Sequence, residues 1–217
     1  MASAFPVNKS LIAGQAGAIE IAAHVSETRA PLAIAVVAHP HPLFGGTMDN
    51  KVATTLARAL FDAGAATYRF NFRGVGGTEG AHDDGRGETA DLLTVAAHAG
   101  SMHPGVSLWL SGFSFGAAVT LAASEQIHCE EMVLVAPGFL RMAHWQNVQS
   151  GGVAPASTLL IHGEKDETVP LEDSLNWARP RDISVIVVPD ADHFFHQRLH
   201  TLRRIIGRWM LPATSRS

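Results

Sequence analysis

Residues 108–118 read Leu-Trp-Leu-Ser-Gly-Phe-Ser-Phe-Gly-Ala-Ala, an apolar run that gives way to a helix-forming one. The apolar part is typical of a buried strand that ends at Gly112, and the part after Ser114 favours a helix. A serine with glycine two positions before and after it is typical of a tight strand-to-helix turn, because the helix there passes close to the strand. Such a turn lifts the Ser114 hydroxyl above the sheet and directs the N–H of Phe115 toward the same point.

This pattern predicts that Ser114 is a nucleophile. The alternative is a serine that only caps a helix, since a Gly-x-Ser-x-Gly match also arises by chance in a chain with 20 glycines. The apolar strand before the serine and the helix-forming run after it favour the nucleophile.

The rest of the chain alternates between two kinds of segment. Short runs rich in Val, Ile and Leu are almost continuously hydrophobic, which is typical of parallel strands covered on both faces. Segments with helical spacing separate them, whereas residues 18–25 alternate and predict an antiparallel edge strand. This order predicts an α/β fold, with a doubly wound, mostly parallel sheet flanked by helices in a single domain spanning residues 1–217. The predicted strands are 32–38, 66–72, 106–111, 132–136, 157–161 and 183–188, and the predicted helices are 50–63, 88–99, 115–124, 171–178 and 194–210.

Composition argues against several classes of partner. The chain has 217 residues, is 47% hydrophobic and has a formal net charge of −4, with its 16 Lys and Arg residues scattered. We therefore expect no nucleic-acid partner, which would require a basic patch. The longest apolar run, residues 32–38, is far shorter than the ~20 residues of a membrane span, so we expect no membrane association. Cys129 is the only cysteine and residues 1–10 lack the pattern of a secretory signal, which predicts a cytoplasmic protein. A homodimer is left open.

A nucleophilic serine needs a base, and the base needs an acid that orients it. Along chains with this turn, the order is serine, acid and histidine, each in a loop after a strand. Asp166 follows the predicted strand 157–161, and His193 follows the predicted strand 183–188. We therefore expect His193 to act as general base and Asp166 to orient it.

Each of these two residues has competitors nearby. Glu164 and Glu167 flank Asp166 and remain alternatives for the acid, although the Gly-x-x-Asp spacing favours Asp166. The competing histidines lie inside the predicted last helix, whereas His193 ends a strand and precedes that helix; they are His196 and His200.

Several stretches resemble the α/β-hydrolase superfamily. Residues 163–170 resemble its acid loop, and residues 192–195 resemble its catalytic-histidine loop. Residues 39–51, His-Pro-His-Pro-Leu-Phe-Gly-Gly-Thr-Met-Asp-Asn-Lys, and residues 69–80, Arg-Phe-Asn-Phe-Arg-Gly-Val-Gly-Gly-Thr-Glu-Gly, are similar to a compact bacterial subgroup of predicted hydrolases related to dienelactone hydrolases and serine peptidases. The resemblance extends from about residue 18 to residue 210. It implies the α/β-hydrolase fold and a Ser–His–Asp triad that works through an acyl-enzyme, without cofactor or metal.

In such an enzyme, two backbone N–H groups hold the oxyanion, and we expect one from Phe115 and one from the loop after strand 32–38. The prolines at positions 40 and 42 have no N–H, which leaves His41 or Leu43 as the second donor. His41 is preferred because it matches the residue after the family's His-Gly pair, although proline replaces the glycine in this chain.

Two other ligand sites are weaker interpretations of the sequence. Residues 39–41 contain two histidines that could form a metal pair with Asp49 or Asp83, but the other ligand positions lack a recognisable spacing. The glycines of residues 74–80 follow a strand, yet Glu79 stands where a dinucleotide-binding loop has its third glycine. We interpret the second segment as a structural turn.

The segment that carries a helical lid in many α/β-hydrolases is short here, since only 20 residues, 137–156, separate two predicted strands. We expect one short helix at residues 140–148 and an open site, with substrate bound at a partly apolar rim that includes Phe44, Phe113 and Phe194. Such a site favours small-molecule carboxylic esters or thioesters with short acyl chains. The alternatives are a serine peptidase and a non-catalytic binding or scaffold protein.

Overall fold

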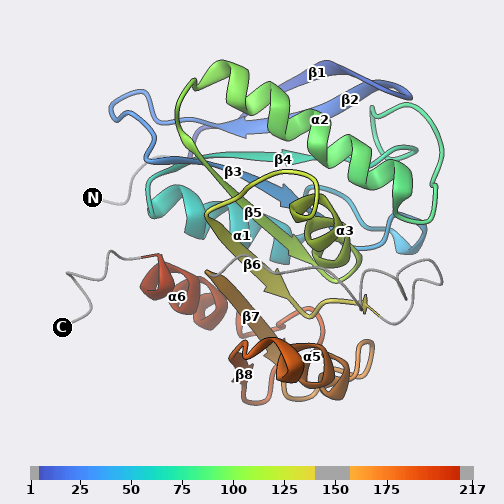
Figure 1. The fold of residues 1–217 in the computed structure, drawn as a ribbon, viewed down its shortest axis with the longest axis vertical. Helices are drawn as coiled ribbons and strands as arrows, with labels where there is room; N and C mark the ends of the chain where they lie inside the picture. Colours follow the sequence, from blue (N-terminus) through green and yellow to red (C-terminus); the bar gives the residue numbers. More distant parts are fainter. Residues whose placement is uncertain (1–4, 140–156, 211–217) are drawn as a thin grey trace.

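The computed structural model describes residues 5–139 and 157–210, and these contain an eight-stranded sheet (Figure 1). The strand order is β1-β2-β4-β3-β5-β6-β7-β8. In this spatial order, every pair of neighbouring strands from β4 onward is parallel. β1 and β2 form an antiparallel hairpin, and β2 is also antiparallel to β4. The strands are β1 (Asn8–Gly14), β2 (Gly17–His24), β3 (Ala33–Ala38), β4 (Ala65–Phe70), β5 (Ser107–Phe113), β6 (Glu131–Val135), β7 (Thr158–Gly163) and β8 (Val185–Val188).

Helices cover both faces of the sheet, which explains why the inner strands are hydrophobic throughout. β3, β4 and β7 are buried along their whole length. α1 and α6 pack together against one face, and α2, α3 and α5 contribute to the core on the other (Figure 1). The predicted doubly wound α/β fold is confirmed. The helices are α1 (Lys51–Asp62), α2 (Arg86–Met102), α3 (Phe115–Ser124), α5 (Leu171–Ala178) and α6 (Leu199–Trp209), with 3-10 turns η1 (Pro42–Phe44) and η3 (Arg179–Arg181).

The hairpin at the start of the chain differs from the prediction. β2 is antiparallel as expected, but it is not an edge strand, because β1 pairs along its outer side. Most residues of β1 are exposed, so this strand lacks the hydrophobic pattern from which the other strands were predicted.

The last helix begins at Leu199, five residues later than predicted. Phe195 and Gln197 have φ angles of 54° and 58°, which an α-helix cannot contain. His196 therefore lies before the helix, where its ring contacts the Asp192 carboxylate at 2.6 Å, rather than on the helix surface.

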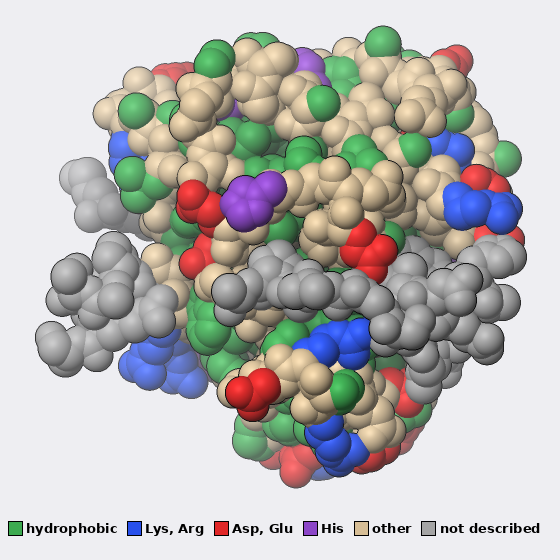
Figure 2. Space-filling view, in the orientation of Figure 1, with side chains coloured by type: hydrophobic (Ala, Val, Ile, Leu, Met, Phe, Trp, Pro, Cys, Tyr) green, Lys and Arg blue, Asp and Glu red, His purple; other side chains and the backbone are tan. Residues whose placement is uncertain are grey.

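Charged side chains are dispersed over the face of the molecule seen in Figure 2, where Lys and Arg lie in small groups among acidic and uncharged atoms. Among the helices that the structure describes, none is both long and apolar enough to cross a membrane.

Candidate active site

Ser114 lies on the tight turn between β5 and α3, at the carboxyl end of the sheet's inner strands. Its φ and ψ angles are 57° and −119°, a backbone conformation that residues other than glycine rarely adopt. A Cβ atom on Gly112 would lie 2.3 Å from the carbonyl oxygen of Gly116, and one on Gly116 would lie 2.4 Å from the carbonyl oxygen of His39. Both glycines are therefore needed for α3 to start this close to β5 and to the loop after β3.

The three residues expected to form the triad are brought together from distant parts of the chain. His193 Nε2 is 3.1 Å from Ser114 Oγ, and His193 Nδ1 is 2.7 Å from Asp166 Oδ2. His193 is only 4% exposed, so its ring is held largely away from water. Because a carboxylate only accepts, Nδ1 carries the hydrogen and Nε2 is left to accept the serine proton.

Asp166 is fixed by bonds to both of its oxygens. Oδ1 accepts from the N–H groups of Thr168 and Val169, while Oδ2 faces His193 and, at 3.3 Å, Nε2 of His162. Burial by itself would raise the pKa of Asp166, but the hydrogen bonds from His162, His193 and Val169 outweigh it and lower that pKa. The carboxylate is therefore ionised at neutral pH.

The alternative acids face away from this group. Glu164 and Glu167 are both exposed, and Glu164 instead accepts a hydrogen bond from the N–H of Asp190. Of the three carboxylates in this loop, Asp166 is the one that contacts His193.

The loop after β3 lies directly against the start of α3. The His41 and Phe115 rings have centroids 4.6 Å apart. The Leu43 N–H donates to His41 Nδ1, which leaves Leu43 poorly suited as an oxyanion donor. Phe115 is the first residue of α3, so its N–H has no partner within the helix.

Several known proteins of similar sequence and structure are serine hydrolases or are described as related to them. Residues 45–154 match the family model described as serine aminopeptidase, S33. An α/β serine hydrolase homologue from Coxiella burnetii is 36% identical, covers 93% of this chain and 96% of its own, and superposes with a TM-score of 0.84. XC6422 from Xanthomonas campestris, described as an α/β serine hydrolase without a lid, is 35% identical, with coverages of 96% and 98% and a TM-score of 0.87. An uncharacterized protein of Rickettsia prowazekii is 28% identical in an alignment 191 residues long, which covers 84% of this chain and 80% of that protein.

The chain belongs to the α/β serine hydrolases. The resemblance that its motifs carry is thus confirmed at the level of family and fold. The segment in which the sequence predicts a short helix in place of a lid, residues 140–148, lies outside the described residues.

A pocket of about 260 Å³ opens at Ser114 and His193 of this α/β serine hydrolase. Two of the three predicted rim residues line it, namely Phe44 and Phe194, which are 86% and 43% exposed. The prediction for Phe113 is wrong, because this residue is completely buried in the core between the sheet and the α1/α6 layer. The centroid of its ring lies 4.8 Å from that of His193, so Phe113 packs against the histidine that contacts Ser114. The other lining residues are Pro40, His41, Gly45, Gly46, Asn50 and Thr168.

Two buried histidines, His162 and His39, hold the loops of the site through hydrogen bonds. The sequence indicates His39 only as a weak candidate metal ligand and predicts no role for His162. His162, at the end of β7, contacts Ser174 Oγ through Nδ1 at 2.8 Å, and through Nε2 contacts the Val169 carbonyl at 2.9 Å and Asp166. The one available signal was its place directly before the Gly-x-x-Asp loop. Since a carbonyl only accepts, His162 Nε2 carries a hydrogen and points it into the acid loop.

His39 holds the loop after β3 in place through hydrogen bonds at both of its ring nitrogens. The Phe72 N–H donates to His39 Nε2 at 3.0 Å, so Nδ1 carries the hydrogen and donates to the Pro40 carbonyl at 2.6 Å. Burial lowers the pKa of His39 to about 4, which keeps the ring neutral. Both ring nitrogens are occupied, so His39 cannot pair with His41 around a metal ion.

The glycine-rich turn after β4 is held by an ion pair. Arg73 donates to both carboxylate oxygens of Asp91 at 3.0 and 2.7 Å, and its backbone N–H adds a third bond at 3.1 Å. Asp91 is 1% exposed. The turn therefore has the structural role expected for it.

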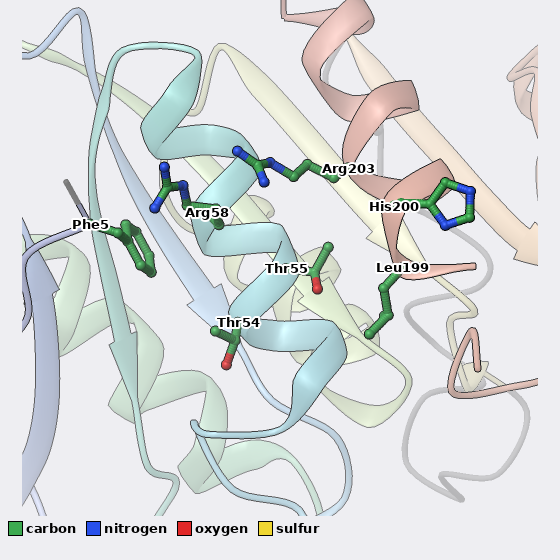
Figure 3. Close-up of a pocket in the computed structure, with 7 residues that line it drawn as sticks. All are labelled: Phe5, Thr54, Thr55, Arg58, Leu199, His200 and Arg203. Carbon is green, nitrogen blue, oxygen red and sulfur yellow. The ribbon is translucent and has the colours of Figure 1, made fainter. Parts of the chain in front are cut away.

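A second hollow lies between α1 and α6 and shares no lining residue with the pocket at Ser114 (Figure 3). Arg203 reaches from α6 toward Arg58 on α1, with Phe5 and Leu199 at its borders. Both arginines pair with Asp62, each through Nε at 3.0 Å. These contacts join the two helices beside the hollow.

Proposed function

We propose that this α/β serine hydrolase cleaves small carboxylic esters or thioesters, with Ser114 as nucleophile, His193 as general base and Asp166 as the acid that orients it. The observation that carries the proposal is the unbroken path from Ser114 Oγ to His193, 3.1 Å, and from His193 to Asp166, 2.7 Å. These contacts are of the length needed to move a proton from a hydroxyl to an imidazole whose tautomer is fixed.

The reaction follows from this path. His193 takes the Ser114 proton as Oγ attacks the carbonyl carbon, and the resulting imidazolium, stabilised by Asp166, then gives that proton to the leaving alcohol or thiol. The N–H groups of Phe115 and His41 hold the oxyanion of each tetrahedral intermediate. Water deprotonated by His193 then releases the acid from the acyl-enzyme. Neither a metal nor a cofactor takes part in these steps.

The dimensions of the pocket favour small substrates. Its volume of about 260 Å³ and the exposed Phe44 and Phe194 rings suit a short acyl chain or a compact alcohol. The second candidate is a serine aminopeptidase, the description of the matching family model. The ammonium group of an aminopeptidase substrate would favour an acidic partner, yet the pocket-lining residues that the structure describes include neither Asp nor Glu. This balance favours the ester.

The first test is labelling with a fluorophosphonate followed by intact-mass measurement. We expect one adduct on the wild type and none on Ser114→Ala or His193→Ala. Ser111→Ala is the matched control, because Ser111 is a buried serine of β5, the strand that leads to Ser114, and its loss should leave labelling unchanged. A folded wild type that forms no adduct would refute the mechanism and favour a binding protein.

The second test measures kcat/KM on short p-nitrophenyl esters, acyl thioesters and aminoacyl p-nitroanilides. Ester or thioester turnover well above that of the anilides supports the proposal. Preferential cleavage of the anilides would instead assign the peptidase activity.

A further inference from the structure

Asn50 stands at the N-terminus of α1 and lines the pocket at Ser114 and His193. Its Oδ1 accepts hydrogen bonds from the N–H groups of Val52 and Ala53, at 2.9 and 3.3 Å. These two bonds fix which end of the amide is oxygen. The NH₂ group is therefore directed elsewhere, and it has no hydrogen-bond partner within residues 5–139 and 157–210.

His41 presents a second donor to the same pocket. Its Nδ1 accepts the N–H of Leu43, so the neutral ring carries its hydrogen on Nε2. Burial and the neighbouring His82 lower the pKa of His41, which favours this neutral form. Nε2 also has no hydrogen-bond partner among the described residues.

Besides Ser114 and His193, the side chains that line the pocket thus include two donors without a partner among the described residues. The amide of Asn50 and the ring of His41 both offer hydrogens, while the Thr168 hydroxyl can donate or accept. The described lining contains no carboxylate, and its other side chains besides Ser114 and His193 are apolar. A ligand that brings only methylene groups would leave these donors without a partner, whereas one that brings an oxygen atom would satisfy at least one of them.

We propose that Asn50 is a specificity-determining residue that, together with His41, selects esters carrying a second acceptor oxygen, such as an alkoxy, hydroxy or keto group, close to the scissile bond. The inference rests on the proposed function, since it describes which esters Ser114 receives. Because each hydrogen bond to an uncharged donor contributes modestly, the preference should be about threefold to tenfold in kcat/KM.

Matched ester pairs isolate this preference. p-Nitrophenyl methoxyacetate and p-nitrophenyl butyrate differ by one ether oxygen in place of one methylene group in the acyl part. 2-Methoxyethyl acetate and butyl acetate differ in the same way in the alcohol part. The quantity to measure is the ratio of kcat/KM within each pair, compared between wild type and variant, because intrinsic reactivity cancels in that comparison.

Asn50→Ser and Asn50→Asp are suitable variants, because serine and aspartate cap a helix as well as asparagine does. Aspartate has no hydrogen to donate, and serine has a single hydroxyl hydrogen on a shorter side chain in place of the two amide hydrogens. We expect the ratio in at least one pair to fall about threefold to tenfold in Asn50→Ser and further in Asn50→Asp, whose negative charge repels the ether oxygen. Both variants should keep the wild-type melting temperature. Lys51→Gln, a change at the exposed neighbouring residue, should leave both ratios unaltered.

The two proposals fail in different ways. A wild type that binds fluorophosphonate at Ser114 and hydrolyses the esters, but whose ratios are unchanged in both Asn50 variants, overturns the selectivity and leaves the esterase function in place. A wild type that neither labels nor hydrolyses any of the four esters overturns both.

Discussion

Replacing His162 by leucine tests whether a buried histidine outside the Ser114–His193–Asp166 group stabilises the acid loop. The change removes the donor shared by the Val169 carbonyl, 2.9 Å, and Asp166, 3.3 Å, and also the partner of the Ser174 hydroxyl, 2.8 Å. All of these groups are buried. Two polar groups left without partners cost about 1–3 kcal/mol each, so the free energy of unfolding should fall by about 2–6 kcal/mol.

The effect of His162→Leu on catalysis should be much smaller than the effect on stability. Asp166 keeps the bond to His193 and the two backbone N–H groups, and it loses only a long contact, which we assign about 1 kcal/mol. That loss corresponds to about a fivefold decrease in kcat. Asp166→Asn, which disturbs the tautomer of the base, should instead lower kcat by about 10⁴.

Urea unfolding and steady-state ester hydrolysis measure the two effects of His162→Leu separately. Ser174→Ala is the matched control, since it removes only the partner of His162 Nδ1 and should cost about 1–3 kcal/mol of stability with kcat unchanged. His162→Gln, which keeps an amide donor, should recover part of the lost kcat. A His162→Leu variant whose kcat equals that of Ser174→Ala, or falls as far as that of Asp166→Asn, would contradict the modest positioning role assigned to His162.

Three further predictions concern the supports of the site. Gly116→Ala should lower kcat by about 10²–10³ and stability by about 1–3 kcal/mol, because its Cβ would lie 2.4 Å from the His39 carbonyl oxygen and displace an oxyanion donor. The control is Gly100→Ala, whose Cβ meets nothing within 4 Å and which should stabilise α2 by about 0.5–1 kcal/mol. Equal effects of Gly116→Ala and Gly100→Ala on thermal unfolding would contradict the steric argument. Arg73→Met should cost about 3–5 kcal/mol in chemical unfolding, because it leaves the buried Asp91 carboxylate unpaired, and a loss below 1 kcal/mol would count against that pairing. His39 has a pKa of about 4 when folded and 6.5 when unfolded, so the unfolded chain binds the additional proton and stability should fall as the pH drops from 6.5 to 4, by up to about 1.4 kcal/mol per pH unit. His39→Gln should reduce this slope, and an unaltered slope would exclude His39 as its source.

The sequence was informative wherever local pattern and chain order determine structure. The continuous apolar runs correspond to β3–β8. The inner strands have no polar side because helices cover both of their faces, whereas β8, at the edge of the sheet, is only partly buried. The positions of Asp166 and His193 followed from the order of strands, because consecutive parallel strands bring their carboxyl ends to one edge of the sheet. β1 escaped detection because an exposed strand that pairs on one side only has little need of apolar residues.

Contacts between loops could not be predicted from the sequence, because such contacts leave no periodic pattern in it. His39 acts through the backbone N–H of Phe72, and Asn50 is oriented by its own helix while it lines a pocket formed largely by other segments. Such roles depend on which loops the sheet brings together. A histidine beside a proline has the same sequence signature whether it binds a metal, faces solvent or holds a loop.

For Phe113, in contrast, the sequence did contain the information needed to predict that its side chain is buried. Side chains alternate along a strand, so Phe113 shares a face with Trp109, and both residues belong to the core formed by α1 and α6. A residue on that face cannot reach the open pocket, although it immediately precedes Ser114. Its ring instead packs 4.8 Å from the ring of His193. The strand that leads to Ser114 thus also supports the His193 ring through its last side chain, so a smaller residue at position 113 should disturb His193 before it affects substrate binding.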